Sequence, residues 1–314
     1  GFLKRDVRED LRTKPSDEGR SMPGPETAVR TRTVGRLSRL SCLLVVTGPV
    51  LAAPAADAPR PNVILVMADD QGWGDTGYNG HPHLKTPHLD RMAADGLVFR
   101  RWYAGAPVCS PTRGSCLTGR HPYRYGIVTA NRGHLPRRER TLAELLSNRG
   151  YRTGHFGKWH LGDQPKFLPL AQGFDEYFGI PYSNDMWPGN KRGNPLTNRG
   201  PYTPLPIVRQ NKAVAHVSDG PDQSLLCEII TDEAVKFIRK HKDEPFFCYV
   251  PHAYVHNPRY ARPHILKRAG GDVNRSNVEE VDDSVGRILR TLCELGIEKN
   301  TLVIFTSDNG CAHY

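Results

Sequence analysis

Four segments that are predicted to be strands each lead directly into charged or polar residues, and this pattern limits the possible fold more than any other sequence feature. The segments are 63–67, 151–156, 246–250 and 301–306, and the first of them is a continuous apolar run. Continuous apolar runs rich in β-branched and aromatic residues are typical of strands buried on both faces, as in a parallel sheet covered by helices. The carboxyl ends of parallel strands share one edge of a sheet, where α/β folds bind ligands. We therefore expect the polar residues after these segments to lie together.

Helical patterns separate the predicted strands, as an α/β fold requires. Helices are predicted at 89–94 and at 224–241. Another helix is predicted to begin at a capping box formed by Thr141 and Glu144, and a fourth to run from a cap at Ser276 and Glu279 to a stop at Gly296. A further strand is predicted at 97–103. Residues 186–223, rich in Pro, Gly and Asn, are predicted to be an irregular loop that borders a pocket. A chain of 314 residues is long enough for one large domain of this kind.

The first predicted strand ends in two adjacent carboxylates, Asp69 and Asp70. Such a pair at the end of a buried strand repels unless one member is protonated or a cation lies between them. A hard divalent ion such as calcium, which takes about 6 to 8 oxygen ligands, would resolve the conflict. A solvated acidic turn is the alternative. The last predicted strand ends in Asp308 and Asn309, which carry the same kind of ligand atoms.

Several other classes of function are disfavoured by the sequence. Gly72, Gly74 and Gly77 form a G-x-G-x-x-G pattern, but turn-forming residues follow them in place of the helix that a dinucleotide site requires. The formal net charge of +10 is compatible with an anionic substrate, yet no cluster of basic and aromatic residues indicates nucleic acid. The seven cysteines fit no zinc pattern and no evident disulfide framework.

Two motifs carry a resemblance to a known family. Cys109, Pro111 and Arg113 form C-x-P-x-R and are followed by Thr-Gly-Arg at 118–120. Residues 150–161 match a second pattern, G-Y-x-T-x-x-x-G-K-x-H-L, at every fixed position. Together they resemble the two signatures of the sulfatases, and residues 173–185 resemble the arylsulfatase A branch of that family.

The resemblance implies a chemistry for these residues. Cys109 would be oxidised to formylglycine by a formylglycine-generating enzyme, and one hydroxyl of the hydrated aldehyde would attack sulfur while the other would later expel the sulfate. Calcium, or magnesium as the alternative, would be held by Asp69, Asp70, residue 109, Asp308 and Asn309. Arg113 and Lys158 would compensate negative charge, and His256, with His252 as the alternative, would protonate the leaving alcohol. His160 would assist deprotonation of the second hydroxyl. Lys158, Ser183 and His256 would contact the substrate.

The resemblance also implies the architecture. Residues 57–314 would form the N-terminal part of an alkaline-phosphatase-like α/β sandwich, a large mostly parallel mixed sheet flanked by helices. The family's smaller C-terminal subdomain and a second sulfate-contacting lysine are not in this sequence. Segment 301–306 would then be an exposed edge strand that is prone to aggregate.

The N-terminal residues predict export. Residues 22–56 combine a basic region, an apolar stretch and small residues, the pattern of a signal peptide, and residues 1–21 are interpreted as an upstream segment outside the fold. The protein would be periplasmic or secreted, without a stable membrane span. A short membrane anchor is the alternative, although the apolar stretch is shorter than a spanning helix.

The substrate stays open at this level. A sulfated small molecule or a sulfated glycan would fit the predicted site. A phosphodiester or phosphonate monoester hydrolase of the same superfamily would share the metal ligands. A non-catalytic fragment that binds sulfated glycans would keep the pocket and leave Cys109 unmodified.

Overall fold

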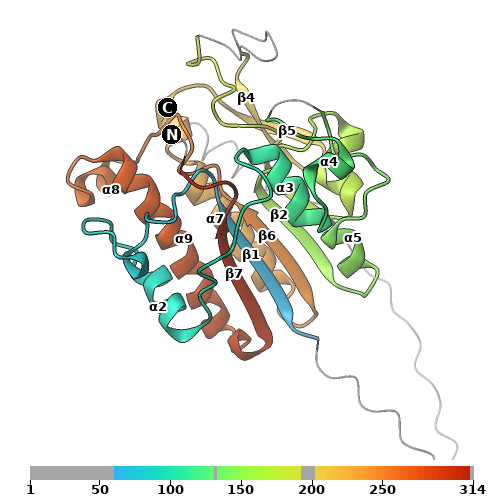
Figure 1. Ribbon diagram of the computed structural model, residues 1–314, viewed down its shortest axis with the longest axis horizontal. Helices are drawn as coiled ribbons and strands as arrows, with labels where there is room; N and C mark the ends of the chain where they lie inside the picture. Colours follow the sequence, from blue (N-terminus) through green and yellow to red (C-terminus); the bar gives the residue numbers. More distant parts are fainter. Residues whose placement is uncertain (1–59, 131–132, 192–201, 312–314) are drawn as a thin grey trace, which may run out of the picture.

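The structure is a computed structural model that describes residues 60–130, 133–191 and 202–311. The predicted signal peptide and the upstream segment lie outside these residues. A seven-stranded sheet with the order β5-β4-β3-β2-β6-β1-β7 forms the centre of the domain (Figure 1). The strands are β1 (Asn62–Ala68), β2 (Arg152–Lys158), β3 (Glu176–Ile180), β4 (Leu205–Arg209), β5 (Lys212–Val217), β6 (Phe246–Pro251) and β7 (Thr301–Ser307).

The sheet is mostly parallel, as the sequence predicts. Strands β3, β2, β6, β1 and β7 run parallel, and β4 and β5 add an antiparallel hairpin at the β3 edge. The α-helices are α2 (Pro87–Asp95), α3 (Cys109–Thr118), α4 (Pro122–Tyr125), α5 (Leu142–Ser147), α6 (Gly220–Gln223), α7 (Leu226–Lys240), α8 (Pro263–Arg268) and α9 (Val273–Glu294). Short 3-10 turns are η1 (Gly77–Asn79), η2 (Pro165–Phe167), η3 (Pro169–Gln172) and η4 (Glu298–Asn300). Among the described residues, no helix is both long and apolar enough to cross a membrane.

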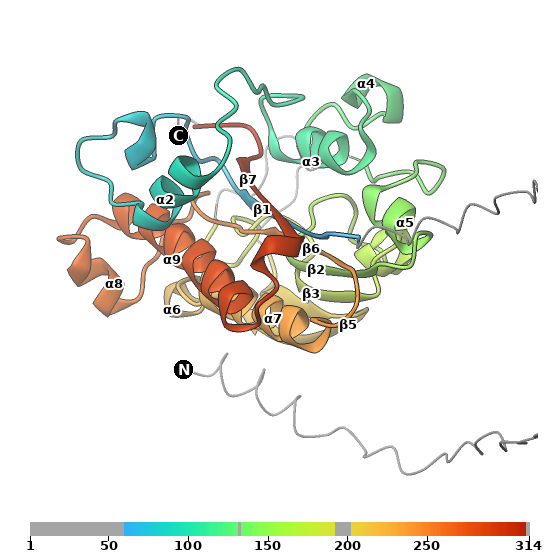
Figure 2. The same cartoon turned by 90° about the horizontal axis from the view of Figure 1, so that it is seen from below.

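Helices cover the sheet on both faces, which explains why the central strands β1 and β6 are almost entirely apolar. In β1, Ile64 and Val66 point into the core shared with α7 and α9. Leu65 and Met67 point to the opposite side, into a second core with α3 and α5. Figure 2 shows α7 and α9 on one side of the sheet and α3 and α5 on the other.

The helix boundaries follow local capping chemistry. The predicted capping box is present, because Glu144 N–H donates to Thr141 Oγ1 at 3.1 Å and Thr141 N–H donates to the Glu144 carboxylate at 2.8 Å. The predicted cap at Ser276 is wrong. Helix α9 begins one turn earlier, where the Asp272 carboxylate accepts two backbone N–H groups, and the Ser276 hydroxyl donates to Asp272 O within the helix.

Two further predictions are wrong. Segment 97–103 is not a strand, because it pairs with no strand in the described part of the chain and is exposed along its whole length. In region 186–223, residues 192–201 lie outside the described residues, and the part from 205 onward forms the hairpin of β4 and β5 and the short helix α6 in place of an irregular loop. The hairpin turn consists of Gln210, which has a positive φ of 57°, and Asn211, so it lacks the glycine that usually reveals such a turn.

Strand β7 forms one edge of the described sheet, as predicted, and pairs only with β1. Two of its apolar side chains are exposed, Leu302 at 53% and Ile304 at 40%. Val303, between them, packs against the core with α7 and α9. An edge strand with exposed apolar side chains is a template for association between chains.

We expect the double substitution Leu302→Lys and Ile304→Lys to slow aggregation, because charge on an edge strand opposes pairing between chains. The thermal midpoint should fall little. Light scattering at increasing protein concentration measures the first effect and thermal unfolding the second. The control is Val303→Lys, which should lower the midpoint because it buries a charge. Unchanged aggregation of the double variant would contradict the prediction.

His155 on β2 is fully buried and is surrounded by four aromatic rings. The rings of Trp159, Phe174, Tyr177 and Tyr249 surround it with centroid distances of 5.2 to 5.4 Å, all edge-on. Neither ring nitrogen has a hydrogen-bond partner in residues 60–130, 133–191 and 202–311. Burial, together with the positive charge of Arg113, holds the pKa of His155 well below its ordinary value of 6.5.

We expect His155→Leu to stabilise the protein by about 1–3 kcal/mol, the cost of a buried polar group without a partner. The unfolded chain binds a proton at His155 below about pH 6.5, whereas the folded chain does not, so stability contributed by this residue is lost as pH falls. The variant should therefore unfold less readily in mild acid.

Urea unfolding at pH 7.5 and 5.5 measures both effects. The matched control is His252→Leu, another fully buried histidine, whose Nε2 is 2.9 Å from Ser284 Oγ. This variant loses a hydrogen bond and should gain no stability at pH 7.5. A destabilised His155→Leu variant at both pH values would refute the interpretation of His155.

Candidate active site

The carboxyl ends of the parallel strands bring the predicted polar residues together. Asp69 follows β1 directly, and its N–H donates to Tyr254 O at 2.7 Å in the loop after β6. Asp308 follows β7, and its N–H donates to Ala68 O at 3.1 Å. The backbone hydrogen bonds of the sheet thus continue one residue beyond the strands and fix the backbone positions of Asp69 and Asp308. Asp70 has a positive φ of 59°, which turns the chain sharply away from the sheet.

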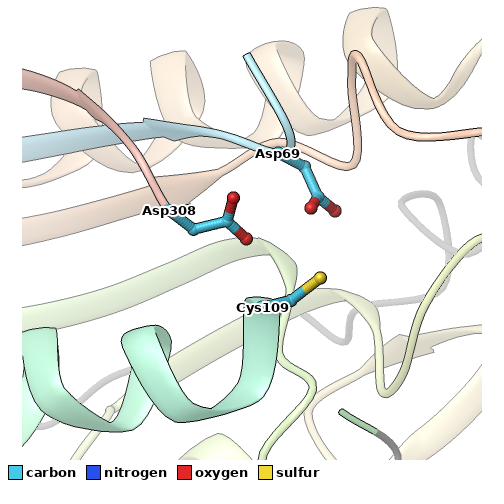
Figure 3. A group of neighbouring side chains, drawn as sticks. All are labelled: Asp69, Cys109 and Asp308. Carbon is cyan, nitrogen blue, oxygen red and sulfur yellow. The ribbon is translucent and has the colours of Figure 1, made fainter. Parts of the chain in front are cut away.

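Asp69, Asp308 and Cys109 form the centre of the site (Figure 3). One ligand atom from each of the three lies within 4.8 Å of the others, and all three residues are buried. Cys109 is the first residue of α3, so the partial positive charge of the helix N-terminus lies at the same place.

Two buried cations compensate the carboxylates. Arg113, one turn along α3 from Cys109, donates to Asp308 Oδ2 through Nε at 3.1 Å and through a terminal nitrogen at 2.9 Å. Lys158 Nζ, at the end of β2, donates to Asp69 Oδ2 at 2.5 Å. Arg113 also lies 3.4 Å from the same Asp69 oxygen. All four side chains are fully buried.

Burial and charge act against each other on these ionisable groups. Burial by itself lowers the pKa of Arg113 and of Lys158, but the neighbouring carboxylates outweigh it and raise both values. Burial, reinforced by the charge of Asp69, raises the pKa of Asp308 from 3.8 to about 6. The charge of Asp308 is therefore disfavoured even beside Arg113, as the sequence argument about crowded carboxylates anticipates.

The Cys109 thiol is kept neutral. Burial raises its pKa well above the ordinary 9.0, and the charges of Asp69 and Asp308 add to this effect against those of Lys158 and Arg113. A reactive cysteine needs a thiolate, which this environment disfavours. The unmodified side chain is therefore a poor nucleophile.

Asp70, Asn309 and His256 form the outer part of the site. Asn309 Nδ2 donates to Asp70 Oδ1 at 2.6 Å, and the other Asp70 oxygen lies 3.6 Å from His256 Nε2. Burial, then the charge of Lys158, lowers the pKa of His256. His252 lies outside this group, because its ring bonds Ser284 on α9, on the far side of the loop.

Ser183 and His160 complete the set of predicted residues. Lys158 Nζ donates to Ser183 Oγ at 3.0 Å, which attaches the loop after β3 to the centre of the site. Burial, reinforced by the charges of Lys158, Arg113 and His256, holds the pKa of His160 well below 6.5. The structure thus brings all ten predicted site residues to one edge of the sheet.

The donor set fits a hard divalent cation. Asp69 Oδ1 and Asn309 Oδ1 are buried and have no hydrogen-bond partner within the described part of the chain. Buried oxygens of this kind are normally satisfied, so each requires an explanation. A cation between Asp69, Asp308 and residue 109 would use such oxygens and would relieve the crowding of carboxylates. Oxygen-rich donor sets are those that calcium and magnesium prefer.

Two site residues carried no signal in the sequence. Asn184 and Gln223 are almost fully buried and connect the loops that carry Ser183 and His256. An amide side chain in a Pro-rich region is usually a surface turn residue, so only the three-dimensional structure identifies the connection.

A sulfatase family model matches residues 61–314. The chain belongs to the sulfatase family. It is 40% identical over 290 residues to mouse N-acetylgalactosamine-6-sulfatase, covering 86% of this chain and 54% of the relative. It is 38% identical over 278 residues to human arylsulfatase A, covering 83% and 54%. This sulfatase chain therefore spans about half the length of the curated relatives it matches.

A solved structure supports the same assignment. The crystal structure of Ps i-CgsB in complex with k-i-k-neocarrahexaose superposes with a TM-score of 0.69 at 29% identity, covering 80% of this chain and 59% of that one. Its similarity extends over the fold described above, so the α/β sandwich of the sulfatases is confirmed for the described residues.

We expect Lys158→Met to destabilise the sulfatase chain by about 3–5 kcal/mol in EDTA, because it leaves Asp69 buried with less compensation. Calcium at millimolar concentration should restore part of the loss, since the site becomes more negative. Urea unfolding with EDTA or calcium measures both effects.

The matched control is Lys240→Met, which breaks an exposed pair with Glu176 at 2.6 Å and should cost less than about 1 kcal/mol. Equal losses in the two variants would show that the buried cluster has no special energetic role.

Proposed function

We propose that this protein hydrolyses sulfate monoesters at the site around residue 109. The observation that carries the proposal is the position of Cys109, at the N-terminus of α3 and against Asp69 and Asp308, beside two buried cations. Family membership supports the reaction class. The alternatives of a phosphodiester hydrolase or a sulfated-glycan-binding fragment have no observation of their own in this structure.

The nucleophile in this proposal is a modified Cys109. The thiol itself is held neutral, and a formylglycine produced by a formylglycine-generating enzyme would instead supply a hydrated aldehyde whose hydroxyl attacks sulfur. The Arg113 guanidinium lies one helical turn away on the same face of α3 and stabilises negative charge on that hydroxyl. No thiolate is needed at any point.

A divalent cation, calcium by preference and magnesium as the alternative, would be held by Asp69, Asp70, residue 109, Asp308 and Asn309. When bound, such an ion lowers the pKa of a coordinated hydroxyl and polarises a sulfate oxygen. The two buried oxygens without partners, on Asp69 and Asn309, support this ligand set.

The chain's own residues would position and neutralise the sulfate. Lys158 presents a compact positive charge, and Ser183 holds its ammonium group from the other side at 3.0 Å. Arg113 adds a second, rigid charge anchored on Asp308. Because these cations are buried and fixed before substrate arrives, little reorganisation is required as charge develops.

Proton transfer falls to the two histidines. His256 would protonate the leaving alcohol as the general acid, with its Nδ1 near Asn257 O at 2.5 Å and its Nε2 toward Asp70. Burial lowers its pKa, but the negative charge of Asp70 favours the protonated ring that an acid requires. His160 would accept a proton from the second hydroxyl of residue 109, because burial lowers its pKa and keeps its ring in the neutral form.

The substrate class we propose is a sulfated sugar, with sulfated small molecules as the second choice. The names of the relatives support a carbohydrate or aryl sulfate. Ps i-CgsB was crystallised with k-i-k-neocarrahexaose, which supports a glycan. The signal peptide proposed at 22–56 would place the enzyme in the periplasm or outside the cell, where such esters occur.

The test is mass spectrometry of the peptide containing Cys109 after co-expression with a formylglycine-generating enzyme. We expect the mass decrease that corresponds to replacement of CH₂SH by CHO, together with hydrolysis of 4-nitrophenyl sulfate. Cys109→Ala should lower kcat/KM by roughly 10³-fold or more, the scale seen when a nucleophile is removed.

The control substrate is bis(4-nitrophenyl) phosphate, which has the same leaving group. A modified protein that hydrolyses this diester faster than the sulfate would contradict the proposed function. Cys116→Ala is the control variant, because this second cysteine of α3 lies outside the central group.

A further inference from the structure

The loop after β3 is attached to the active site through Ser183, and hydrogen bonds within the loop hold the residues that follow. Ser183 Oγ accepts from Lys158, and Met186 N–H donates to Ser183 O at 3.0 Å. Asn190 Nδ2 donates to Asp185 O at 3.0 Å. Asp185 therefore lies in a tight turn, two residues beyond a side chain that contacts the central lysine.

A buried amide pair connects this loop to the loop of His256. Gln223 Nε2 donates to Asn184 O at 2.8 Å, and Asn184 Nδ2 lies 3.5 Å from His256 O. Tyr254 donates its hydroxyl to Gln223 O at 3.0 Å. The side chains of Asn184, Gln223 and Tyr254 are all almost fully buried. The position of Asp185 relative to His256 is thus fixed by the fold.

The Asp185 carboxylate has an unused acceptor. Its Oδ1 is buried and has no hydrogen-bond partner among the described residues. Asn184, the residue before Asp185, contacts the loop of His256, because its Nδ2 lies 3.5 Å from His256 O. The Asp185 carboxylate therefore belongs to the segment that adjoins the proposed general acid.

The negative charge of Asp185 determines which part of a substrate this carboxylate can contact. Lys158 and Arg113 lie where a sulfate group would be held, whereas Asp185 forms no salt bridge with a lysine or arginine among the described residues and would repel sulfate. A carboxylate in the segment that adjoins His256 is therefore better suited to contact the alcohol part of a sulfate ester than the sulfate itself. An ionised carboxylate only accepts hydrogen bonds, so its partner must carry an O–H or N–H group.

We infer that Asp185 is a specificity-determining residue that accepts a hydrogen bond from a hydroxyl or amide N–H on the alcohol part of the substrate. The inference rests on the proposed function and narrows its substrate class. It favours a sugar sulfate with a free donor near the ester over a simple aryl sulfate.

The experiment compares two substrates in the matured protein. N-acetylgalactosamine 6-sulfate offers hydroxyl and amide donors, and 4-nitrophenyl sulfate offers none. Asp185→Ala should lower kcat/KM for the sugar sulfate about 10- to 100-fold, the range for a hydrogen bond to a charged group. The same variant should change kcat/KM for the aryl sulfate by less than about 3-fold, and the loss should be mainly in KM.

A second measurement separates recognition from an effect through His256. Calorimetric titration with N-acetylgalactosamine, which carries no sulfate, involves no proton transfer. Asp185→Ala should weaken this binding by the same factor as it raises KM. The control is Asp175→Ala, which removes the same charge from the other end of β3 and should change none of these values.

The outcomes are distinct. An equal loss for both substrates, or unchanged binding of N-acetylgalactosamine, would overturn the role of Asp185. Weaker sugar binding with a selective loss of sugar sulfate turnover would support it. If the wild-type protein hydrolysed neither sulfate, the proposed function would fail, while the calorimetric comparison would still decide whether Asp185 contacts a sugar.

Discussion

The structure depends on a buried group of charges in which Asp69 and Asp308 face each other and Arg113 and Lys158 compensate them. The four residues come from β1, β7, α3 and β2, so the charges connect three strands of the sheet to the helix that begins with Cys109. Ion pairs at such depth repay their desolvation only with good geometry. The same precise placement of these side chains is therefore required for a stable fold and for the proposed reaction. The two positive charges that hold the strand ends in place are also the charges that a sulfate group needs.

Close backbone contacts keep this group in position. Gly157, next to Lys158, has a positive φ of 138°, and a Cβ atom there would lie 1.9 Å from Pro251 O. A side chain at this position would push β2 away from β6 and displace Lys158 with it. The requirement for glycine at this position of the second sulfatase motif is thus steric and does not depend on catalysis. His160 also has a positive φ, 59°, which turns the chain so that its ring faces the site.

The sequence predicts the central sheet and the site well, because both depend on the same local pattern. Strands β1 and β6 consist almost entirely of apolar residues, and β1 and β7 lead into the acidic residues Asp69 and Asp308, a type that is rarely buried. The sequence predicts the edges of the sheet poorly. Strands β4 and β5 are short and joined by a turn without glycine, and segment 97–103 is apolar without being buried. The role of Gln223 depends on contacts distant in sequence, which no periodicity reveals.

The alternation along β1 has a consequence for how this sequence can change. Ile64 and Val66 belong to one core, and Leu65 and Met67 belong to the other, with Asp69 directly beyond. Insertion of one residue within this strand would exchange the two sets and would carry the carboxylate to the wrong side of the sheet. The strand can tolerate single apolar substitutions, but it cannot tolerate the insertion or deletion of a residue. Natural variation in this region should consist of exchanges between apolar residues, with insertions and deletions confined to the loops.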